Sequence, residues 1–520
     1  MRKPRLVAPS VLLLVFTLST PSLSAQAAAL RAAAATITAA DVSRRIHIIA
    51  DDSMLGRDTP SPGLEMTAKY VADEFRRVGL KPMGENGTWF QRYTISRRRI
   101  DAAGSHVGFM IAGTHVHANL DQDARFAFGS VPAQEVMAPA VLLGGAYAAS
   151  DVEALDVTGK VVLVVMDYRK PIPPVVQQIL GGLSQRGPKG IVLLSNRDST
   201  VFATRVRAQS AIRVTVGAGD DASPVVEVHE RSLGEVLHLA GLNLDSIRAL
   251  ETAAIVPLPQ LTIGLGLKDE VLSEASAPNT IGVLEGSDPK LKQEYLVYSA
   301  HMDHVGVAGP NGTGGCQAKG ADSICNGADD DGSGTVGIME LAEAFTRKGV
   351  RPKRSIIFMT VSGEEKGLWG SNYFSEHPTV PLPQIVADIN IDMIGRNWKD
   401  TIVAIGQEHS DLGATLSRVT AAHPQLNMAA IADRWPEENF YFRSDHFNFA
   451  RKGVPILFFF NGVHPDYHQV SDSPDKLDAE KESRILQLLF YLGQDVANAA
   501  ARPQWIPESY DKIVEKKPAA

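Results

Sequence analysis

Histidine and carboxylate side chains cluster in five short segments of the second half of the chain. Several carboxylates that lie close together repel one another and raise each other's pKa values unless a cation neutralises them. Imidazoles mixed with carboxylates suit one or two Zn²⁺ ions with open positions for water, which is the chemistry of metal-assisted hydrolysis. The segments are 301–304 (His-Met-Asp-His), 326–334 (Asn-Gly-Ala-Asp-Asp-Asp-Gly-Ser-Gly), 363–365 (Gly-Glu-Glu), Asp392 and 464–468 (His-Pro-Asp-Tyr-His).

Four continuous apolar runs stand shortly before four of these segments and are predicted to be buried strands. Helical segments such as 336–348 alternate with them, which indicates an α/β fold with a mostly parallel central sheet flanked by helices on both faces. Open α/β sheets bind ligands at the carboxyl ends of their strands, so the polar segments are expected at one rim. The predicted strands are 295–300, 355–361, 385–391 and 455–460.

Two earlier regions have different patterns. Between residues 37 and 80 apolar residues recur at spacings of three and four, which predicts helices, and Gly79 is suited to end the second helix. Between residues 138 and 259, short β-type runs such as 160–165 predict an inserted, mainly β module that contains few carboxylate and histidine clusters. The alternative is that these strands belong to one large sheet.

The N-terminus has the features of a secretory signal peptide. A basic start is followed by the apolar run 11–18 and by the small-x-small site Ala25-Gln26-Ala27, so cleavage is predicted after Ala27. The apolar core of about eight residues is much shorter than the roughly 20 that span a bilayer, so no stable membrane anchor is expected. The protein is predicted to be exported to the periplasm or the extracellular medium.

Composition limits the partners and the metal ligands. Lysine plus arginine number 51 against 59 aspartate plus glutamate, a net charge of −8, so no nucleic-acid partner is expected. The chain has only 2 cysteines, so a metal must be held by histidines and carboxylates. In an exported protein Cys316 and Cys325 are expected to form one disulfide that stiffens the acidic loop, and two free thiols are the alternative.

The acidic loop also fits part of a calcium-binding pattern. Asp329, Asp331, Ser333 and Glu340 fall at positions 1, 3, 5 and 12 of an EF-hand loop. An EF-hand needs an entering helix, however, and the glycine-rich stretch 309–320 cannot form one. The pattern therefore favours a zinc site over a calcium site.

Together these motifs resemble the di-zinc aminopeptidase family that includes bacterial leucyl aminopeptidase and glutamate carboxypeptidase II. The resemblance extends upstream to Leu55-Gly56-Arg57 and to residues 79–82, and the middle module is similar to a protease-associated domain. It implies a zinc exopeptidase fold with two Zn²⁺ per chain. The motifs that carry it are 301–303, 326–334, 363–371 (Gly-Glu-Glu-Lys-Gly-Leu-Trp-Gly-Ser), 390–393 (Asn-Ile-Asp-Met) and Tyr467-His468.

The resemblance implies five metal ligands. Asp329 would bridge the two ions and precede a cis peptide bond, between Asp329 and Asp330. The remaining ligands would be Glu365 and His468 on one ion, and His301 and Asp392 on the other.

Other polar residues would support the reaction. By the same resemblance Glu364 would be the general base, and Asp303 would orient a ligating imidazole. Tyr467 is expected either to donate a hydrogen bond to the developing oxyanion or to serve as an aromatic wall. The three further histidines near the site are expected to serve local structure; they are His304, His446 and His464.

The chain is divided into five predicted parts, and each is named for its expected role. They are a signal peptide (1–27), an N-terminal part of the catalytic domain (28–137), the protease-associated insert (138–259), the main part of the zinc peptidase domain (260–505) and a C-terminal tail (506–520). The tail is rich in proline and charged residues and is expected to be only partly ordered.

The implied activity is that of a metallo-aminopeptidase acting on peptides with a free N-terminus. The segment 435–449 is expected to form a wall for an apolar first side chain. A carboxypeptidase or dipeptidase on the same scaffold is an alternative, in which Arg396 or Arg443 would hold a substrate carboxylate. A non-catalytic, receptor-like protein and a cyclase-like enzyme that works with one zinc ion are further alternatives.

Overall fold

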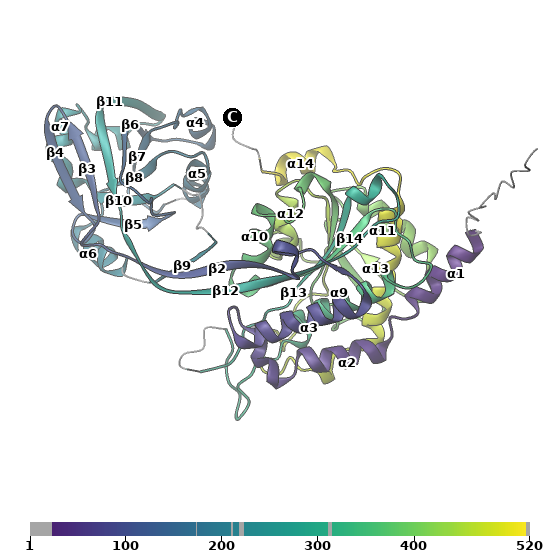
Figure 1. Cartoon of the computed structure of the whole chain (residues 1–520). Helices are drawn as coiled ribbons and strands as arrows, with labels where there is room; N and C mark the ends of the chain where they lie inside the picture. The colour runs from purple at the N-terminus through teal and green to yellow at the C-terminus, as the bar shows by residue number, and fades with distance from the viewer. Residues whose placement is uncertain (1–22, 173, 210–211, 218–222, 310–314, 516–520) are drawn as a thin grey trace, which may run out of the picture.

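The computed structural model describes residues 23–172, 174–209, 212–217, 223–309 and 315–515. The basic start and the apolar core of the predicted signal peptide lie outside these residues, and the predicted cleavage site lies within helix α1 (Leu23–Ala34). The described residues form two units, each around its own sheet, and long strands connect the units (Figure 1). Within these ranges, no helix combines the length and the apolar character that a membrane span requires.

The larger unit contains a ten-stranded sheet whose centre is parallel. Four neighbouring strands run in the same direction, and each matches a predicted strand to within one residue at either end. Nearly all of their side chains are buried, as expected for strands covered on both faces. Their bounds are β13 Tyr295–His301, β14 Ser355–Val361, β15 Ile385–Ile391 and β18 Ile456–Phe459.

The outer strands make this sheet mixed rather than mostly parallel. The strand order is β17-β16-β18-β15-β13-β14-β12-β2-β9, and β1 also pairs with β12. β12 is antiparallel to both β14 and β2, and β16 is antiparallel to β18. The predicted parallel sheet therefore holds only for the centre. The outer bounds are β1 Lys81–Pro82, β2 Phe90–Ile100, β9 Arg213–Val216, β12 Asp269–Leu284, β16 Thr401–Ile405 and β17 Ala429–Ile431.

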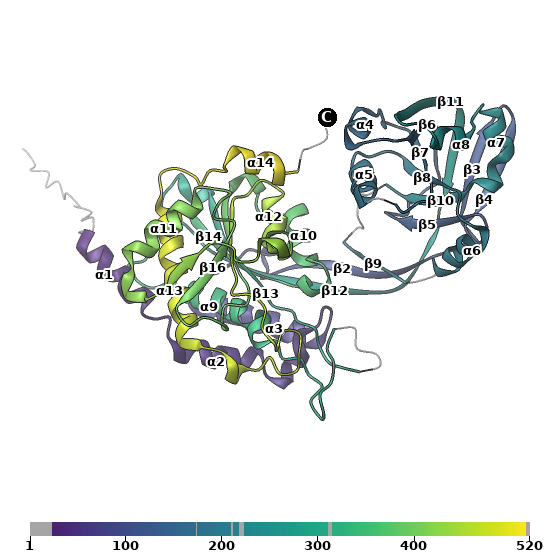
Figure 2. The ribbon, with the colours of Figure 1, turned by 180° about the vertical axis from the view of Figure 1, so that it is seen from behind.

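Helices cover both faces of the larger sheet, as predicted (Figure 2). Gly79 ends α3 with a φ of 87°, a conformation that glycine adopts without strain, so the predicted helix end is confirmed. One face packs against α1, α2 (Ala39–Ile49), α3 (Pro62–Val78), α9 (Gly334–Phe345), α11 (Leu412–Ala422) and α13 (Ala479–Asn498), and the other against α10 (Trp369–Glu376), α12 (His446–Ala450) and α14 (Pro507–Ile513).

The C-terminal segment is more ordered than its composition suggested. The indole Nε1 of Trp505 donates a hydrogen bond of 2.9 Å to the carbonyl oxygen of Gly453. Helix α14 follows, and Glu515 forms ion pairs with Arg451 and with Lys452, the latter at 2.7 Å. These contacts fix the segment up to Glu515 against the turn that follows α12, and the end of the predicted tail lies outside the described residues.

The second unit has a separate eight-stranded sheet in the order β4-β3-β11-β6-β7-β8-β10-β5. It begins at β3 and not at residue 138, because Val107, Phe109 and Phe126 belong to the same core as the later strands. Local sequence patterns do not record such long-range packing. The bounds are β3 His106–Ile111, β4 Thr114–Asn119, β5 Ala124–Phe128, β6 Val136–Gly145, β7 Val161–Val165, β8 Gly190–Ser195, β10 Val225–His229, β11 Ala253–Gly266, α4 Ala149–Ala154, α5 Pro174–Gln185, α6 Ser199–Ala208, α7 Gly234–Leu239 and α8 Leu244–Arg248.

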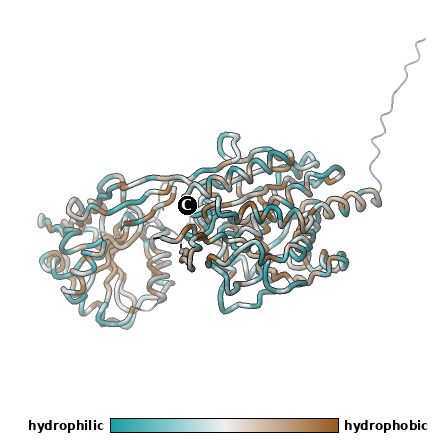
Figure 3. Tube along the Cα trace, turned by 90° about the horizontal axis from the view of Figure 1, so that it is seen from below, coloured by the Kyte–Doolittle hydropathy of each residue, from teal (hydrophilic) through white to brown (hydrophobic). Residues whose placement is uncertain are grey.

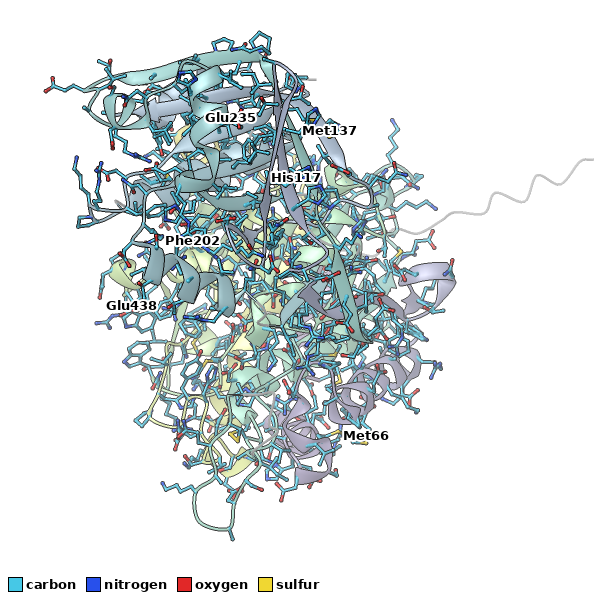
Figure 4. The ribbon with its side chains drawn as sticks, turned by 90° about the vertical axis from the view of Figure 1, so that its left-hand side faces the viewer. Met66, His117, Met137, Phe202, Glu235 and Glu438 are labelled. Atoms are coloured by element: carbon cyan, nitrogen blue, oxygen red, sulfur yellow. A yellow bond between two sulfur atoms is a disulfide. The ribbon has the colours of Figure 1, made fainter. Side chains whose placement is uncertain are left out.

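Strands β2 and β12 carry the chain between the two units. They remain paired in antiparallel fashion up to Ile100, which lies opposite Asp269. The exposed apolar side chains Met66 and Met137 lie far apart on the surface (Figure 4). Most apolar residues instead gather inside each unit (Figure 3). Each unit therefore has its own hydrophobic core.

Candidate metal centre

The parallel strands bring the polar segments of the sequence to one rim of the larger sheet. His301 is the last residue of β13, and Glu364 and Glu365 form a short turn after β14. Asp392 directly follows β15, and His468 lies in the loop after β18. Because these strands share one direction, their carboxyl ends meet at the same edge.

Asp330 lies between two pairs, each made of a histidine and a carboxylate. On one side its Oδ1 is 3.3 Å from Nε2 of His301, which in turn is 3.6 Å from Oδ1 of Asp392. On the other side its Oδ2 is 3.2 Å from Nε2 of His468, which in turn is 3.0 Å from Oε2 of Glu365. The structure thus brings together four of the five predicted ligands, with Asp330 at their centre.

The central position was predicted for Asp329, and this prediction is wrong. Oδ1 of Asp329 accepts a hydrogen bond of 2.6 Å from the backbone N–H of Gly395, and its Oδ2 is 3.2 Å from Nε2 of His464. The cis peptide bond joins Asp330 to Asp331, one position later than predicted. Successive side chains of this tight loop point in different directions, and the spacing of three adjacent aspartates does not reveal which one faces the other ligands.

Asp331 has a structural role that sequence reasoning missed. It approaches His301 and Asp392 closely enough to be considered a metal ligand. However, its Oδ1 accepts hydrogen bonds from the backbone N–H groups of Gly334 and Met393, and its Oδ2 accepts one from the N–H of His301. Asp331 therefore joins the acidic loop to the ends of β13 and β15.

His304 lies at the site, although it was expected to serve local structure only. It is fully buried, and its Nδ1 lies 2.9 Å from Oε1 of Glu365 and 3.6 Å from Oδ2 of Asp330. These three side chains form a second group that is close enough to hold a metal ion. The direct contact between His304 and Glu365 fixes that carboxylate from the side opposite His468.

Asp303 and the backbone around it position two of the predicted site residues. Nδ1 of His301 lies 3.1 Å from the carbonyl oxygen of Asp303 and 3.7 Å from its carboxylate Oδ1. The carbonyl oxygen, rather than the predicted carboxylate, is therefore the closer group that orients the imidazole. The carboxylate instead accepts a hydrogen bond of 3.2 Å from the N–H of Glu364.

Glu364 has the environment of a proton-transfer group. Burial raises the pKa of its carboxyl group well above the usual range, and the nearby negative charge of Glu365 adds to this effect against the opposing influence of His301. A carboxyl group that titrates closer to neutral pH can both accept and donate a proton under ordinary conditions.

A small cavity of about 50 Å³ opens beside the cluster. Its lining includes polar and aromatic side chains, and Tyr467, whose ring centre lies 3.8 Å from that of His468, forms part of the wall. Of the predicted aromatic wall, Phe440 lines the cavity, whereas Tyr441 packs against His409 and Phe442 is half exposed. The other lining residues are His301, Asp330, Glu364, Asp392, Met393, Arg443, Ser444, Phe458, Phe460 and Val463.

The unpaired polar atoms of the site fit metal binding. Oδ2 of Asp330, Oδ1 of Asp392 and Nε2 of His468 are buried and have no hydrogen-bond partner of acceptable geometry among the described residues. Burying such atoms without a partner is costly, and a cation would satisfy all three. Imidazole nitrogens mixed with carboxylate oxygens are a donor set that suits Zn²⁺.

The predicted disulfide is present and lies beside the site. Cys316 and Cys325 are bonded, with their Cα atoms 5.7 Å apart. Cys325 is buried in a small cluster with Val305 and Val470. The disulfide therefore supports the acidic loop and the loop that carries His468 at the same time.

Comparisons with known proteins find similarity to peptidases. Residues 279–493 match the model of peptidase family M28. The chain is 26% identical over 230 residues to a probable leucine aminopeptidase of Arthroderma otae, and the aligned region covers 43% of this chain and 58% of that protein. It is 24% identical over 333 residues to aminopeptidase YwaD of Bacillus subtilis, and this aligned region covers 61% of this chain and 64% of that protein.

Solved structures align with a larger share of the chain, at lower identity. An aminopeptidase from Aneurinibacillus sp. strain AM-1 matches with a TM-score of 0.44 and 17% identity, covering 90% of this chain and 96% of that one. The chain spans about six tenths of the length of the curated relatives described above, 58% and 64%. Residues 279–493 are thus similar to peptidase family M28, and the curated relatives described above are aminopeptidases.

Proposed function

We propose that the chain is an exported, binuclear zinc exopeptidase that releases N-terminal residues from peptides. One observation carries this proposal: the carboxylate of Asp330 lies 3.3 Å and 3.2 Å from the Nε2 atoms of His301 and His468. The match of residues 279–493 to peptidase family M28 supports hydrolysis of peptide bonds. The relatives described as aminopeptidases support action at the N-terminus.

Five side chains would hold the two ions. Asp330 would help to hold both ions, in place of the predicted Asp329, because it lies close to both His301 and His468. Glu365 and His468 would complete one site, and His301 and Asp392 the other. When bound, two zinc ions lower the pKa of a water molecule and polarise the peptide carbonyl group.

Glu364 would move the proton in this reaction. Its raised pKa and its position on the cavity wall support this role. The carboxylate would accept a proton from the attacking water and then donate it to the nitrogen of the leaving amine. The hydrogen bond from its N–H to Asp303 would keep Glu364 in place during both transfers.

Tyr467 would stabilise negative charge on the substrate oxygen. Burial raises the pKa of its phenol group, and the surrounding carboxylates add to this effect, so the hydroxyl group stays protonated. A protonated phenol on the cavity wall can donate a hydrogen bond to a developing oxyanion.

The polar and the aromatic side chains that line the cavity would recognise the amino group and the side chain of an N-terminal residue, respectively. The carboxylates of Glu364 and Asp392 favour a positively charged amino group. The aromatic side chains of the lining would receive an apolar side chain; they are Phe440, Phe458 and Phe460.

A second candidate, a carboxypeptidase or dipeptidase, is favoured by one observation. Arg443 lines the same cavity, and its guanidinium group lies 4.7 Å above the ring of Phe440. A guanidinium group there is suited to hold a substrate carboxylate. Arg396, the other arginine considered, is engaged in an ion pair of 2.9 Å with Asp466.

Peptide end-blocking separates the two candidates. The zinc-loaded protein is incubated with one peptide series that has a free N-terminus and one that is N-acetylated, and the products are sequenced by mass spectrometry. An aminopeptidase shortens only the free series, from the N-terminal end. Loss of C-terminal residues from both series would support the second candidate, and binding without cleavage would support a receptor-like protein.

The Glu364→Gln variant tests the proposed proton transfer. It should retain the zinc content of the wild type, measured by elemental mass spectrometry, and lose at least about 100-fold in kcat, the usual contribution of general acid–base catalysis. Glu437→Gln, at an exposed position, is the matched control and should behave like the wild type. Full turnover by Glu364→Gln would exclude this residue as the base.

Export is supported by the disulfide, which forms in oxidising compartments. N-terminal sequencing of the protein recovered outside the cytoplasm should give Ala28 as the first residue. A protein that retains its initial segment and two alkylatable thiols would contradict this part of the proposal.

A further inference from the structure

Arg57 is a fully buried arginine whose guanidinium group contacts backbone carbonyl oxygens at the proposed metal centre. Its Nε donates to Met302 at 2.9 Å, beside His301 at the end of β13. Its Nη1 and Nη2 donate to Asn326 and Gly327 at 2.5 and 2.8 Å, in the loop that leads to Asp330. Two further hydrogen bonds reach the carbonyl oxygen of Ile49 at the end of α2, at 3.0 Å, and that of Asp330, at 3.5 Å.

An unusual backbone turn directs this side chain inward. Leu55, Gly56 and Arg57 have φ values of 52°, 61° and 53°, all in the left-handed region that costs energy for residues other than glycine. A Cβ atom on Gly56 would lie 2.5 Å from the carbonyl oxygen of Gly306 and 2.6 Å from that of Cys325. The turn therefore lies tightly between the two loops that Arg57 joins, and only its contacts keep it in this conformation.

Adjacent residues of the same segment reach a third part of the site. Asp58 pairs with Lys366 at 2.7 Å, directly after the turn of Glu364 and Glu365. The hydroxyl group of Thr59 accepts a hydrogen bond of 3.1 Å from the N–H of Gly363. Segment 57–59 thus contacts the ends of β13 and β14 as well as the acidic loop.

Arg57 differs from the other fully buried large arginines of the described chain in its charge partners. Arg45 and Arg354 each contact at least one glutamate. No carboxylate contacts Arg57 among the described residues, and the nearby negative charges belong to Asp330, Asp303 and their neighbours. A buried cation without a direct partner is stable only where such a field exists. Its charge therefore offsets the surplus of carboxylates at the site.

We propose that Arg57 is a positioning residue of the metal centre. By holding the backbone at Met302 and at Asn326–Gly327, it sets the separation of His301 and Asp330 before the ions bind. This inference rests on the proposed zinc function. A lysine at this position keeps the charge but cannot make these five hydrogen bonds, because its ammonium group is compact and offers only three donors.

The test compares Arg57→Lys with Arg354→Lys. Arg354 is a matched control because it is also fully buried and donates to the carbonyl oxygens of Val496 and Ala499, far along the chain from the site segments. Zinc affinity is measured by competition with a chromophoric chelator at a temperature where each variant is folded. We expect Arg57→Lys to bind zinc about 10- to 100-fold more weakly, as for other outer-sphere partners of metal sites. Arg354→Lys should match the wild type.

Two further readouts separate positioning from general stability. The visible absorption of the cobalt-substituted protein reports ligand geometry and should change in Arg57→Lys only. In turnover assays kcat should fall more than KM rises, because the positioned groups act on the reacting bond. Arg57→Gln provides the same measurements if the lysine variant does not fold.

The outcomes are distinct. Unchanged zinc affinity and an unchanged cobalt spectrum in a folded Arg57 variant would overturn the positioning role, and so would failure of both variants to fold, since that would indicate a general folding role. If the wild-type protein itself binds no zinc, the proposed function fails instead, whatever the variants do.

Discussion

Three adjacent aspartates of the acidic loop have three different environments. Asp329 binds the N–H of Gly395 and faces His464, whereas Asp331 accepts three backbone hydrogen bonds. Asp330 lies between His301 and His468, with its two carboxylate oxygens 3.3 Å and 3.2 Å from their Nε2 atoms. Identical side chains thus acquire different roles because a tight loop aims each one at a different neighbour.

Single substitutions at Asp329 and Asp330 should therefore have different effects. Asp330→Asn should lower zinc affinity by more than the roughly 100-fold typical of outer-sphere changes, since it removes a proposed ligand to both ions. Asp329→Asn should mainly lower the free energy of unfolding, by about 1–3 kcal/mol, because it weakens buried hydrogen bonds. Zinc titration and urea unfolding of both variants check this. Stronger loss of zinc from Asp329→Asn would restore the original assignment.

His446 predicts a measurable pH dependence of stability. Its Nε2 lies 2.8 Å from the carbonyl oxygen of Tyr441, its ring stacks on Phe458, and burial lowers its pKa to about 3. In the unfolded chain its pKa is near 6.5, so below that pH the unfolded state binds a proton that the folded state does not. Its contribution is therefore complete above pH 6.5 and is lost as pH falls toward 3.

The size of this effect follows from the two pKa values. Between pH 7.5 and 5 the zinc-free protein should lose about 2 kcal/mol of unfolding free energy through His446. In His446→Gln this part of the pH dependence should disappear, whereas the exposed His115→Gln control should retain it. Urea unfolding with a chelator present gives the measurement. Equal pH dependence in both variants would contradict the prediction.

At the scale of elements, one buried ion network joins three helices around the site. Arg45 on α2 contacts Glu340 and Glu343 on α9 and Glu74 on α3, the last two at 2.7 and 2.8 Å. Arg45 and Glu340 are 1% and 2% exposed, so neither charge has water as an alternative partner. Because α9 directly follows the acidic loop, this network fixes the helix from which Asp330 is presented.

Removal of the central charge should be costly. Arg45→Met should lower the free energy of unfolding by about 3–5 kcal/mol, because it leaves buried glutamates without a partner. Arg44→Met is the neighbouring control: that side chain is 51% exposed, and its ion pair should contribute less than about 1 kcal/mol. Urea unfolding followed by far-ultraviolet circular dichroism compares the two variants. A similar small loss in both would show that the network adds little stability.

At the scale of the molecule, the second unit is attached through an antiparallel strand pair. Ile100 lies opposite Asp269, so the chain leaves and re-enters the larger unit at neighbouring positions. The second unit also has its own core. This geometry is that of a β-hairpin whose turn has been replaced by a complete folded unit.

The larger unit should therefore fold without the second one. We expect a chain in which residues 101–268 are replaced by Asn-Gly to retain the far-ultraviolet spectrum of the larger unit and the zinc content per chain of the full protein. Loss of β9 would leave β2 as an exposed edge, so the state of association must be measured by light scattering. A soluble monomer without zinc would show that the second unit helps to form the site.

Sequence patterns predicted the strands of the larger sheet well and the limits of the second unit poorly. Runs such as 355–361 are apolar at almost every position because both faces of a central strand are covered, so local composition is sufficient. The boundary at residue 138 was wrong because β3 to β5 join the second unit through packing with strands far along the chain. The sequence indicated Arg57 only as part of the motif Leu55-Gly56-Arg57, because no residue next to it in the sequence shows that its side chain is buried.

By itself the sequence determined the kinds of groups available and the edge of the sheet at which they meet. Residue types, the four strands and the two cysteines were sufficient for this, because composition and periodicity are local properties. Only the tertiary structure decided that Asp330, and not Asp329, faces His301 and His468, and that Arg57 holds the surrounding loops. Direction and burial of a side chain depend on every element packed around it, and a linear spacing does not contain that information.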